Sequence, residues 1–338
     1  MKSMKESVLN YCSVIGGDPL LVQGAGGNVS WKAADTLWIK ASGTWLSDAE
    51  KKDIFVPVDL NPLKHEITAG RFNLSSNLRT TSNLRPSIET ILHALMPHPV
   101  VLHLHAVEIL SHLVRRGYEQ TLPDLLDSKI RWANVAYFKP GAELARAVWD
   151  ALSKTPDAEV VLLQNHGVVI GGADVSTIDA IIRKLIDMFR VAPIPIADTP
   201  LPSTNINLAG GKSYVPVPDT NVQQLATNIA LFDRLETDWV LYPDHVVFLG
   251  PAARTYDRVE DFKKEMDRIA DVPELFFVRG VGVFMQAEFS IAKQVQLRCY
   301  YDVISRQDRH TVLNSLNNSQ IADLLNWDAE RYRIRIAK

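Results

Sequence analysis

The chain has 338 residues, of which 46% are hydrophobic and 22% are charged, and its formal net charge is −3. This composition is typical of a globular protein that can bury a sizeable core, in one large domain or in two. The balanced charge, without a dense basic block, disfavours nucleic acid as a partner. No apolar stretch is long enough to span a bilayer, and glycines soon interrupt the first apolar residues, unlike a signal peptide. The two cysteines, Cys12 and Cys299, have no CxxC spacing, so we expect reduced thiols and a cytoplasmic protein.

Strands alternate with helices over roughly residues 1–192, which predicts a layered α/β domain. A helix is expected near residues 4–15, and "NVSWK" and "TLWIKAS" form a hairpin pattern around the turn "AADT". The spacing of apolar residues predicts a helix over 86–96, followed directly by an apolar strand, "HPVVLHLHAVE", that contains two histidines. The run "EVVLLQNHGVVIGG" is expected to be a second apolar strand, and a long amphipathic helix follows it.

The composition changes to Pro, Ser, Asn and Gly over residues 193–220, which predicts a linker or an extended crossing segment. A second α/β pattern occupies residues 221–338, with a helix near 221–236, a strand pair around Gly280 and Gly282, and a helix through "SIAKQVQLRCYYDVISRQ". We therefore predict a smaller second α/β domain at 221–338.

The histidines of the first apolar strand are the strongest candidates for chemistry. Successive side chains of a strand point to opposite faces, so His103 and His105 project from the same face about 7 Å apart. A pair of hydrogen-bonded core histidines would give the same pattern, and a metal site is favoured only if a third ligand exists. His166, in "LLQNHGVVIGG", is that candidate. Three neutral imidazoles that leave one position open are typical of a catalytic zinc-type site.

Glu89 is expected in the first turn of the helix that leads into the histidine strand. A carboxylate there is commonly a helix-terminal residue stabilised by the macrodipole. The alternative is a general base beside a metal-bound substrate.

Three turns offer groups that could bind an anion. "QGAGGNVS" is not a dinucleotide fingerprint, because Val29 stands where the third glycine is required and a strand follows instead of a helix. Three segments could instead bind an oxyanion. They are the glycines and the asparagine amide of "QGAGGNVS", the turn in "KASGTW" with a nearby lysine, and the start of the helix expected at 86–96. The candidate residues are Gly27, Asn28, Lys40, Ser42, Gly43 and Ser87.

Taken in chain order, "GNVS", "SG", "PSIE", "HLH" and "NHG" resemble the class II aldolase/adducin family of zinc enzymes, over roughly residues 20–190. The resemblance implies a three-layer α/β/α domain in which His103, His105 and His166 hold Zn²⁺ or another divalent metal. It also implies that Glu89 is the catalytic acid/base and that the anion-binding residues contact the substrate phosphate. Many family aldolases have a second serine before the glutamate, whereas this chain has Ile88.

A narrower resemblance is carried by "WIKASGTWL", "YFKPGAELA", "PDHVVFLGP" and "VRGVGVFM". These runs are similar to the aldolase portion of long proteins that join a rhamnulose-1-phosphate aldolase region to a short-chain dehydrogenase. In that interpretation both predicted domains belong to the aldolase portion.

The resemblance implies a zinc-dependent aldolase that cleaves a ketose 1-phosphate, or a related sugar derivative such as a sugar acid, through a metal-stabilised enediolate. The alternatives are a sugar-phosphate epimerase, decarboxylase or dehydratase that uses the same site, or a non-catalytic, adducin-like interaction module. An oxidoreductase is disfavoured because the dinucleotide fingerprint is missing. The family also implies a homo-oligomer, with neither nucleic acid nor a membrane as partner.

Overall fold

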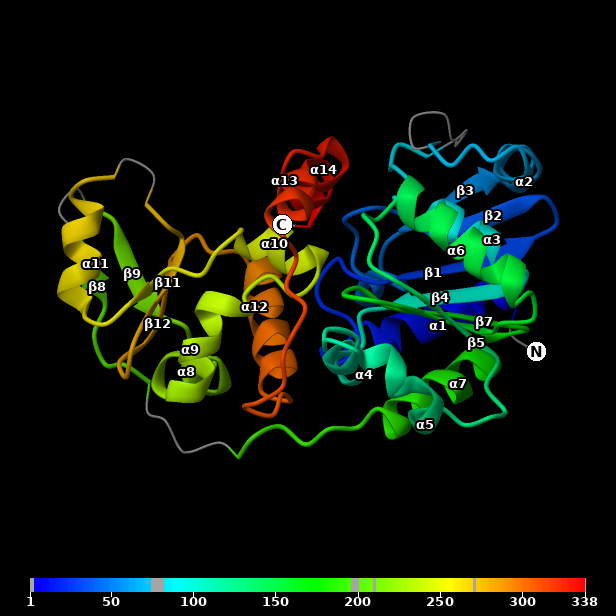
Figure 1. The fold of residues 1–338 in the computed structure, drawn as a ribbon. Coiled ribbons are helices and arrows are strands. Elements are labelled where there is room, and N and C mark those ends of the chain that lie inside the picture. Colours follow the sequence, from blue (N-terminus) through cyan, green and yellow to red (C-terminus); the bar gives the residue numbers. More distant parts are fainter. Residues whose placement is uncertain (1–2, 74–81, 196–200, 209–210, 270–271, 338) are drawn as a thin grey trace.

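The computed structural model describes residues 3–73, 82–195, 201–208, 211–269 and 272–337, and its strands form two sheets (Figure 1). The larger sheet has seven strands in the order β3-β2-β1-β4-β7-β6-β5. Neighbouring strands are antiparallel, apart from β5 and β6. The strands are β1 (Asn28–Ala33), β2 (Thr36–Lys40), β3 (Phe55–Asp59), β4 (Val100–Leu104), β5 (Trp132–Val135), β6 (Val160–Leu163) and β7 (Gly167–Gly172). The hairpin expected at β1 and β2 is confirmed.

Helices cover both faces of this sheet. Strand β4 shows why: Leu102 and Leu104 belong to one apolar cluster and Val101 to another on the opposite face, so both faces need an apolar cover. One face packs against α1 (Met4–Ile15), α4 (Val107–Leu113) and α7 (Val175–Met188). The other packs against α2 (Leu60–Thr68), α3 (Thr90–Leu95) and α6 (Ala142–Lys154). Three short helices lie in the connections: η1 (Leu46–Asp48), η2 (Tyr118–Gln120) and α5 (Leu122–Leu125). The predicted three-layer α/β/α arrangement is confirmed.

Two predicted elements differ from the structure at the positions that matter for the site. The helix expected over 86–96 begins only at Thr90, because Pro86 forms a bridge with Ala41 and keeps the chain extended. The run expected to be a single strand folds back on itself as β6 and β7. Asn165 makes this turn in the left-handed conformation, with φ of 49°, which asparagine tolerates better than most residues.

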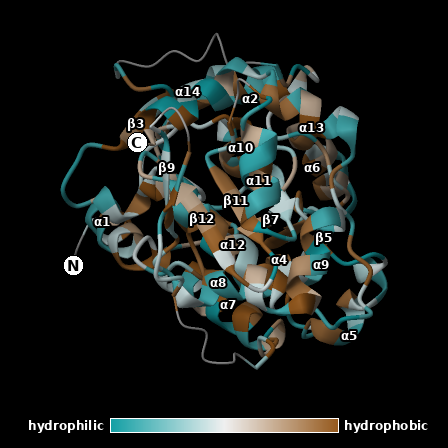
Figure 2. Cartoon of the chain, turned by 90° about the vertical axis from the view of Figure 1, so that its left-hand side faces the viewer, coloured by the Kyte–Doolittle hydropathy of each residue, from teal (hydrophilic) through white to brown (hydrophobic). Residues whose placement is uncertain are grey.

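The second sheet has five strands in the order β10-β11-β12-β9-β8. These are β8 (Ile206–Asn207), β9 (Ser213–Pro216), β10 (Thr255–Tyr256), β11 (Leu275–Val278) and β12 (Gly282–Gln286). Helix α11 (Val259–Met266) covers one face, where Phe262 stacks on Phe276 with ring centroids 3.7 Å apart. The other face packs against α8 (Thr220–Thr227), and the apolar cluster continues from there through α9 (Ile229–Thr237), α10 (Pro243–Leu249), α12 (Ile291–Ile304) and α13 (Asn318–Leu325). Figure 2 shows the hydrophilic colour of α11 against the hydrophobic colour of β11 and β12.

The linker expected at 193–220 is corrected in part, because β8 and β9 lie within it. The segment is rich in Pro, Ser and Asn and therefore resembles a linker in composition. Its strands β8 and β9 nevertheless form the edge of the second sheet, where β9 pairs with β12 from later in the chain. The helix expected near 221–236 is two helices, since the Asn228 side chain accepts hydrogen bonds from the first turn of α9 and starts a new helix there.

The two regions share an apolar interface between α4 and α12 (Figure 1). Val107, Leu110 and Val114 belong to the same buried cluster as Leu297 and Tyr300 of α12. The last helix, α14 (Asp328–Ile336), follows the second region in the chain and lies against the first, where its residues line a pocket together with residues of the larger sheet. The division at 192 and 221 stays a prediction. Among the helices in the described ranges, none is both long and apolar enough to cross a bilayer.

We expect the buried ion pair between α4 and the end of α12 to contribute strongly to stability. Arg306 donates from Nη2 to Glu108 Oε1 at 3.0 Å, and both side chains are 8% exposed. Glu108→Ala would leave the Arg306 guanidinium buried without its carboxylate, and should lower the free energy of unfolding by about 3–5 kcal/mol. Urea denaturation measures this loss.

Asp187→Ala is the matched control for that pair. It removes a surface ion pair with Arg190, in which both side chains are more than 60% exposed, and should cost less than about 1 kcal/mol. Equal losses in the two variants would contradict the importance of the buried pair.

Candidate active site

The three histidines meet at the end of the central strand β4. His103 lies within β4, between Asn28 of β1 and Val169 of β7, and His105 follows the last residue of that strand. His166 lies in the turn between β6 and β7. One ring nitrogen of each lies within 4.8 Å of the others, and all three residues are buried. The structure therefore brings together the three histidines that the sequence singled out.

The turn that carries His166 fits closely against β4. A Cβ on Gly167 would lie 2.2 Å from the carbonyl oxygen of Leu104, so only glycine permits this approach. Asn165 Nδ2 donates to the carbonyls of Leu241 at 2.7 Å and of Asn314 at 2.6 Å. The second region of the chain thus holds the turn from outside.

The hydrogen bonds of the rings make this donor set suitable for a cation. His103 Nδ1 lies 3.1 Å from the Val168 carbonyl oxygen, and a carbonyl can only accept, so Nδ1 carries the proton and Nε2 presents a lone pair. His105 Nδ1 faces Asp244 Oδ2 at 3.4 Å, which favours the same tautomer. The two Nε2 atoms lie 3.2 Å apart, close to the separation of about 3.3 Å expected for two nitrogens on one tetrahedral zinc. Burial lowers the pKa of His103 and so favours the neutral imidazole that a metal requires. These residues fit a metal ion.

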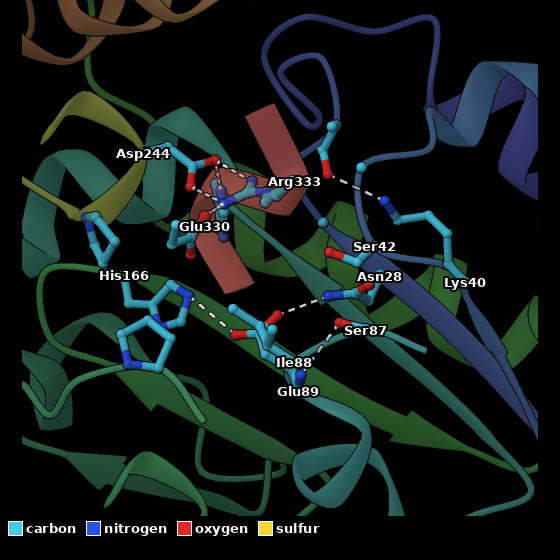
Figure 3. A pocket seen from close by; sticks show the side chains of 16 residues that line it. Asn28, Lys40, Ser42, Ser87, Ile88, Glu89, His166, Asp244, Glu330 and Arg333 are labelled. Carbon is cyan, nitrogen blue, oxygen red and sulfur yellow. Dashed lines mark hydrogen bonds and ion pairs between the residues drawn. The ribbon is translucent and has the colours of Figure 1, made fainter. Parts of the chain in front are cut away.

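The carboxylate of Glu89 faces the histidine cluster. Its Oε1 lies 3.2 Å from His166 Nε2, its Oε2 lies 3.4 Å from His103 Nε2, and Asn28 Nδ2 donates to Oε2 at 2.6 Å (Figure 3). Glu89 directly precedes α3 and does not cap it with its side chain. Its backbone N–H donates to Ser87 Oγ at 3.2 Å. Glu89 thus lies at the start of the helix, but its carboxylate is directed at the imidazoles.

The electrostatics of Glu89 follow from these neighbours. Burial raises the pKa of its carboxyl, whereas positive charge in the neighbouring imidazole cluster, at His103 first, lowers it, and the net shift is below the ordinary value. The carboxylate is therefore ionised beside the imidazoles, where it can accept a proton.

The predicted anion-binding residues line one small pocket together with Glu89, His105 and His166. We call this the inner pocket; its free volume is about 30 Å³. It shares Ser42, Ser87, Ile88 and Pro140 with an outer cavity of about 800 Å³. The inner pocket can hold a few water-sized groups, and a larger molecule would extend into the outer cavity.

Most of the predicted anion contacts are already used within the fold. Lys40 Nζ donates to the carbonyls of Ala25 at 3.0 Å and Thr44 at 2.6 Å, so it joins two loops. Burial, with the nearby Arg333 second, lowers the pKa of Lys40 to about 7. The N–H of Ser42 donates to the Arg85 carbonyl, and the N–H of Ser87 to the Lys40 carbonyl. The segments around Ser42 and Ser87, two of the three predicted turns, thus use these backbone donors to bond to each other.

Sequence reasoning missed three charged residues of the inner pocket, all from the second region. Arg333 of α14 donates to both oxygens of Asp244 on α10, at 2.5 and 2.7 Å, and Glu330 lies 3.4 Å from the same guanidinium (Figure 3). Gly43 allows α14 this close, because a Cβ there would lie 2.6 Å from that of Ile336. In the sequence, the charged residues of α14 look like an exposed helix face, so nothing marked them as site residues. Asp244 lies in "PDHVVFLGP", a run that was noted only for its resemblance to the aldolase portion of longer proteins.

The profile described as Class II Aldolase and Adducin N-terminal domain matches residues 6–191. This chain belongs to the class II aldolase/adducin family. The match spans the larger sheet, the three histidines and Glu89, and it confirms the family resemblance of the sequence motifs.

This class II aldolase/adducin protein has a curated relative that matches part of its length. It is 27% identical over 240 residues to "Uncharacterized oxidoreductase YuxG" of Bacillus subtilis, which covers 66% of this chain and 34% of that protein. The chain thus spans about a third of the length of this curated relative, as the narrower resemblance to part of a longer protein implied.

Two solved structures illustrate the structural comparison. The N-terminal class II aldolase domain of a conserved Thermoplasma acidophilum protein is 24% identical, covers 56% of this chain and 93% of its own, and has a TM-score of 0.49. An L-fuculose-1-phosphate aldolase from Thermus thermophilus is 15% identical, covers 55% and 93%, and has a TM-score of 0.38.

Removing one imidazole should weaken metal binding. In His166→Ala the nitrogen beside Glu89 is lost, so we expect the protein to retain far less Zn²⁺ or Co²⁺ after dialysis, measured by mass spectrometry of the metal. His310→Ala, at an exposed position, is the control and should bind as the wild type does. Equal metal content in the two variants would exclude His166 as a ligand.

Proposed function

We propose that this chain is a metal-dependent aldehyde-lyase that cleaves a sugar derivative by a reversible aldol reaction. The observation that carries the proposal is the position of Glu89: a buried carboxylate that shares the inner pocket with His105 and His166 and lies within 3.4 Å of imidazole nitrogens of His103 and His166. Family membership supports the reaction class.

His103, His105 and His166 would hold the metal, for which we propose Zn²⁺, although another divalent cation would suit three imidazoles as well. When bound, such a cation polarises a carbonyl and stabilises negative charge on its oxygen, worth several kcal/mol in the transition state. The burial of the site strengthens this effect because water is excluded.

Glu89 would move the proton at carbon. In the cleavage direction the electron pair of the broken C–C bond stays on the donor fragment, and protonated Glu89 supplies the proton that forms the new C–H bond. In the synthesis direction the Glu89 carboxylate removes that proton. Asn28 positions the carboxylate by donating to its Oε2 at 2.6 Å, and leaves Oε1 turned toward His166.

The substrate is proposed as a ketose 1-phosphate or a related sugar derivative such as a sugar acid. The contacts within the inner pocket favour a hydroxyl-bearing part of the substrate there, with any phosphate or carboxylate further out: Lys40 and the N–H groups of Ser42 and Ser87 are engaged by carbonyls, and Ile88 adds an apolar side chain. Hydroxyl groups of Ser42 and Ser87 suit the hydroxyls of a sugar. Assembly into homo-oligomers and a cytoplasmic location stay predictions.

The same residues could also serve an epimerase, decarboxylase or dehydratase, since each needs a carbanion beside a carbonyl. A non-catalytic adducin-like module is less well supported, because an interaction surface has no need of three buried imidazoles and a buried carboxylate directed at one pocket.

The test is proton exchange at the donor carbon. Metal-loaded protein is incubated in heavy water with dihydroxyacetone phosphate and, separately, with dihydroxyacetone, and loss of the carbon-bound proton is followed by NMR. We expect exchange that a chelator abolishes. Glu89→Gln should slow it by about 10²–10⁴-fold, as for loss of a general base, with its metal content unchanged.

Glu119→Gln, at an exposed position, is the control and should exchange normally. Undiminished exchange in Glu89→Gln would exclude Glu89 as the base. Absence of exchange with either donor in the metal-loaded wild type would refute the aldolase proposal.

A further inference from the structure

Glu330 is a buried carboxyl group that has no role in the proposed proton transfer at carbon. The residue is 2% exposed and lines the inner pocket together with Glu89, His105 and His166. Its Oε2 lies 3.4 Å from Arg333 Nη1, whereas Oε1 has no hydrogen-bond partner among the residues that the structure describes. A buried carboxyl oxygen without a partner costs free energy, which points to a partner supplied by a ligand.

A purely structural role as counter-ion does not explain Glu330. The Arg333 guanidinium is already neutralised by two short contacts with Asp244, the bidentate geometry that stabilises such pairs best. A second carboxyl group at 3.4 Å is not needed for charge balance. Burial raises the pKa of Glu330, which makes the group better suited to exchange a proton with a ligand than to serve as a fixed counter-ion.

The position of Glu330 is fixed by contacts along α14. Arg333 holds the helix to Asp244 in the interior, and at its start Trp327 receives the Lys139 ammonium 4.9 Å from its ring centroid. On the outside, Arg85 lies over Tyr332 at 4.5 Å. The start and the middle of the helix are therefore tied to the first region and Arg333 to α10, so the carboxyl group of Glu330 is held in the pocket.

An aldol reaction needs proton transfer at two atoms. One is the donor carbon, served by Glu89, and the other is the hydroxyl oxygen on the acceptor side of the C–C bond that breaks. Figure 3 shows Glu330 with Arg333 and Asp244 on one side of the pocket, and Glu89 with Asn28 and Ser87 on the other. Two carboxyl groups that face one pocket from different sides can serve the two atoms separately.

We propose that Glu330 is a second catalytic residue, the acid/base for the hydroxyl oxygen of the scissile aldol unit; this rests on the proposed function. In cleavage, the Glu330 carboxylate takes the hydroxyl proton as the C–C bond breaks and the carbonyl of the released aldehyde forms. The bonding pair stays on the donor fragment, which takes its proton from Glu89. In synthesis, protonated Glu330 donates to the aldehyde oxygen as the new C–C bond forms.

The two half-reactions separate this role from that of Glu89. Exchange at the donor carbon needs no aldehyde, whereas condensation of the same donor with an aldehyde needs both proton transfers. The probes are dihydroxyacetone phosphate and dihydroxyacetone as donors, with glycolaldehyde, glyceraldehyde and lactaldehyde as acceptors. Condensation is measured as new ketose by NMR or chromatography.

Glu330→Gln keeps the size of the side chain and removes the acid. We expect exchange close to the wild-type rate, normal metal content, and condensation slower by about 10²–10⁴-fold. Glu330→Asp keeps a carboxyl group and should retain part of the condensation activity. Asp323→Asn, at an exposed position of the neighbouring helix α13, is the matched control and should leave both reactions intact.

Three results would overturn the assignment. Undiminished condensation in Glu330→Gln would show that another group handles the hydroxyl proton. Loss of exchange and condensation together, with metal retained and an unchanged urea midpoint, would show that Glu330 acts on the whole site. If Glu330→Gln is unstable, Glu330→Asp becomes the test. Complete loss of condensation in Glu330→Asp, with normal exchange, would then show that a carboxyl group is not what the position requires. Failure of the wild type to exchange either donor would instead refute the proposed function.

Discussion

The site depends on one buried ion pair, between Arg333 of α14 and Asp244 of α10. Both oxygens of Asp244 accept from the guanidinium at 2.5 and 2.7 Å, and the carboxylate is 1% exposed. Burying two charges is costly unless the geometry is this close. The same carboxylate faces His105 at 3.4 Å. The pair therefore does two things: it orients an imidazole of the first region and holds the last helix over the pocket.

The two halves of the chain contribute differently to the pocket. The larger sheet supplies a rigid frame, since His103 lies in its central strand between two hydrogen-bonded neighbours, and a strand in that place has little freedom to move. The second region supplies the cover, and α14 rests on a position where only Gly43 leaves room. A frame without the cover would leave the imidazoles open to water, which would weaken the electrostatic stabilisation that such a site can provide.

Local patterns in the sequence predicted the frame, but not the cover. The alternation of His103 and His105 is a local feature and predicted that pair, whereas His166 was a candidate third ligand that the family resemblance supported. The turn between β6 and β7 could not be predicted, because Asn165 and His166 interrupt an apolar run that otherwise fits one strand. Glu330 and Arg333 lie three residues apart on a polar helix, as on any solvated face. Their burial depends on long-range packing with α10, which no local pattern encodes.

The same long-range packing decides what the inner pocket can offer an anion. Three separate turns suggested an oxyanion cradle, yet folding uses Lys40 and two of the backbone donors to join the loops to each other. Glu330 adds a carboxyl group to the pocket, and the Arg333 guanidinium is already paired with Asp244. A phosphate dianion would have to displace these contacts and meet a carboxyl group, whereas a sugar hydroxyl would need to displace none of them. The balance of charge in the pocket therefore favours a substrate whose reacting end carries hydroxyl groups, with any anionic group further out, in the outer cavity beside Arg85 and Lys139.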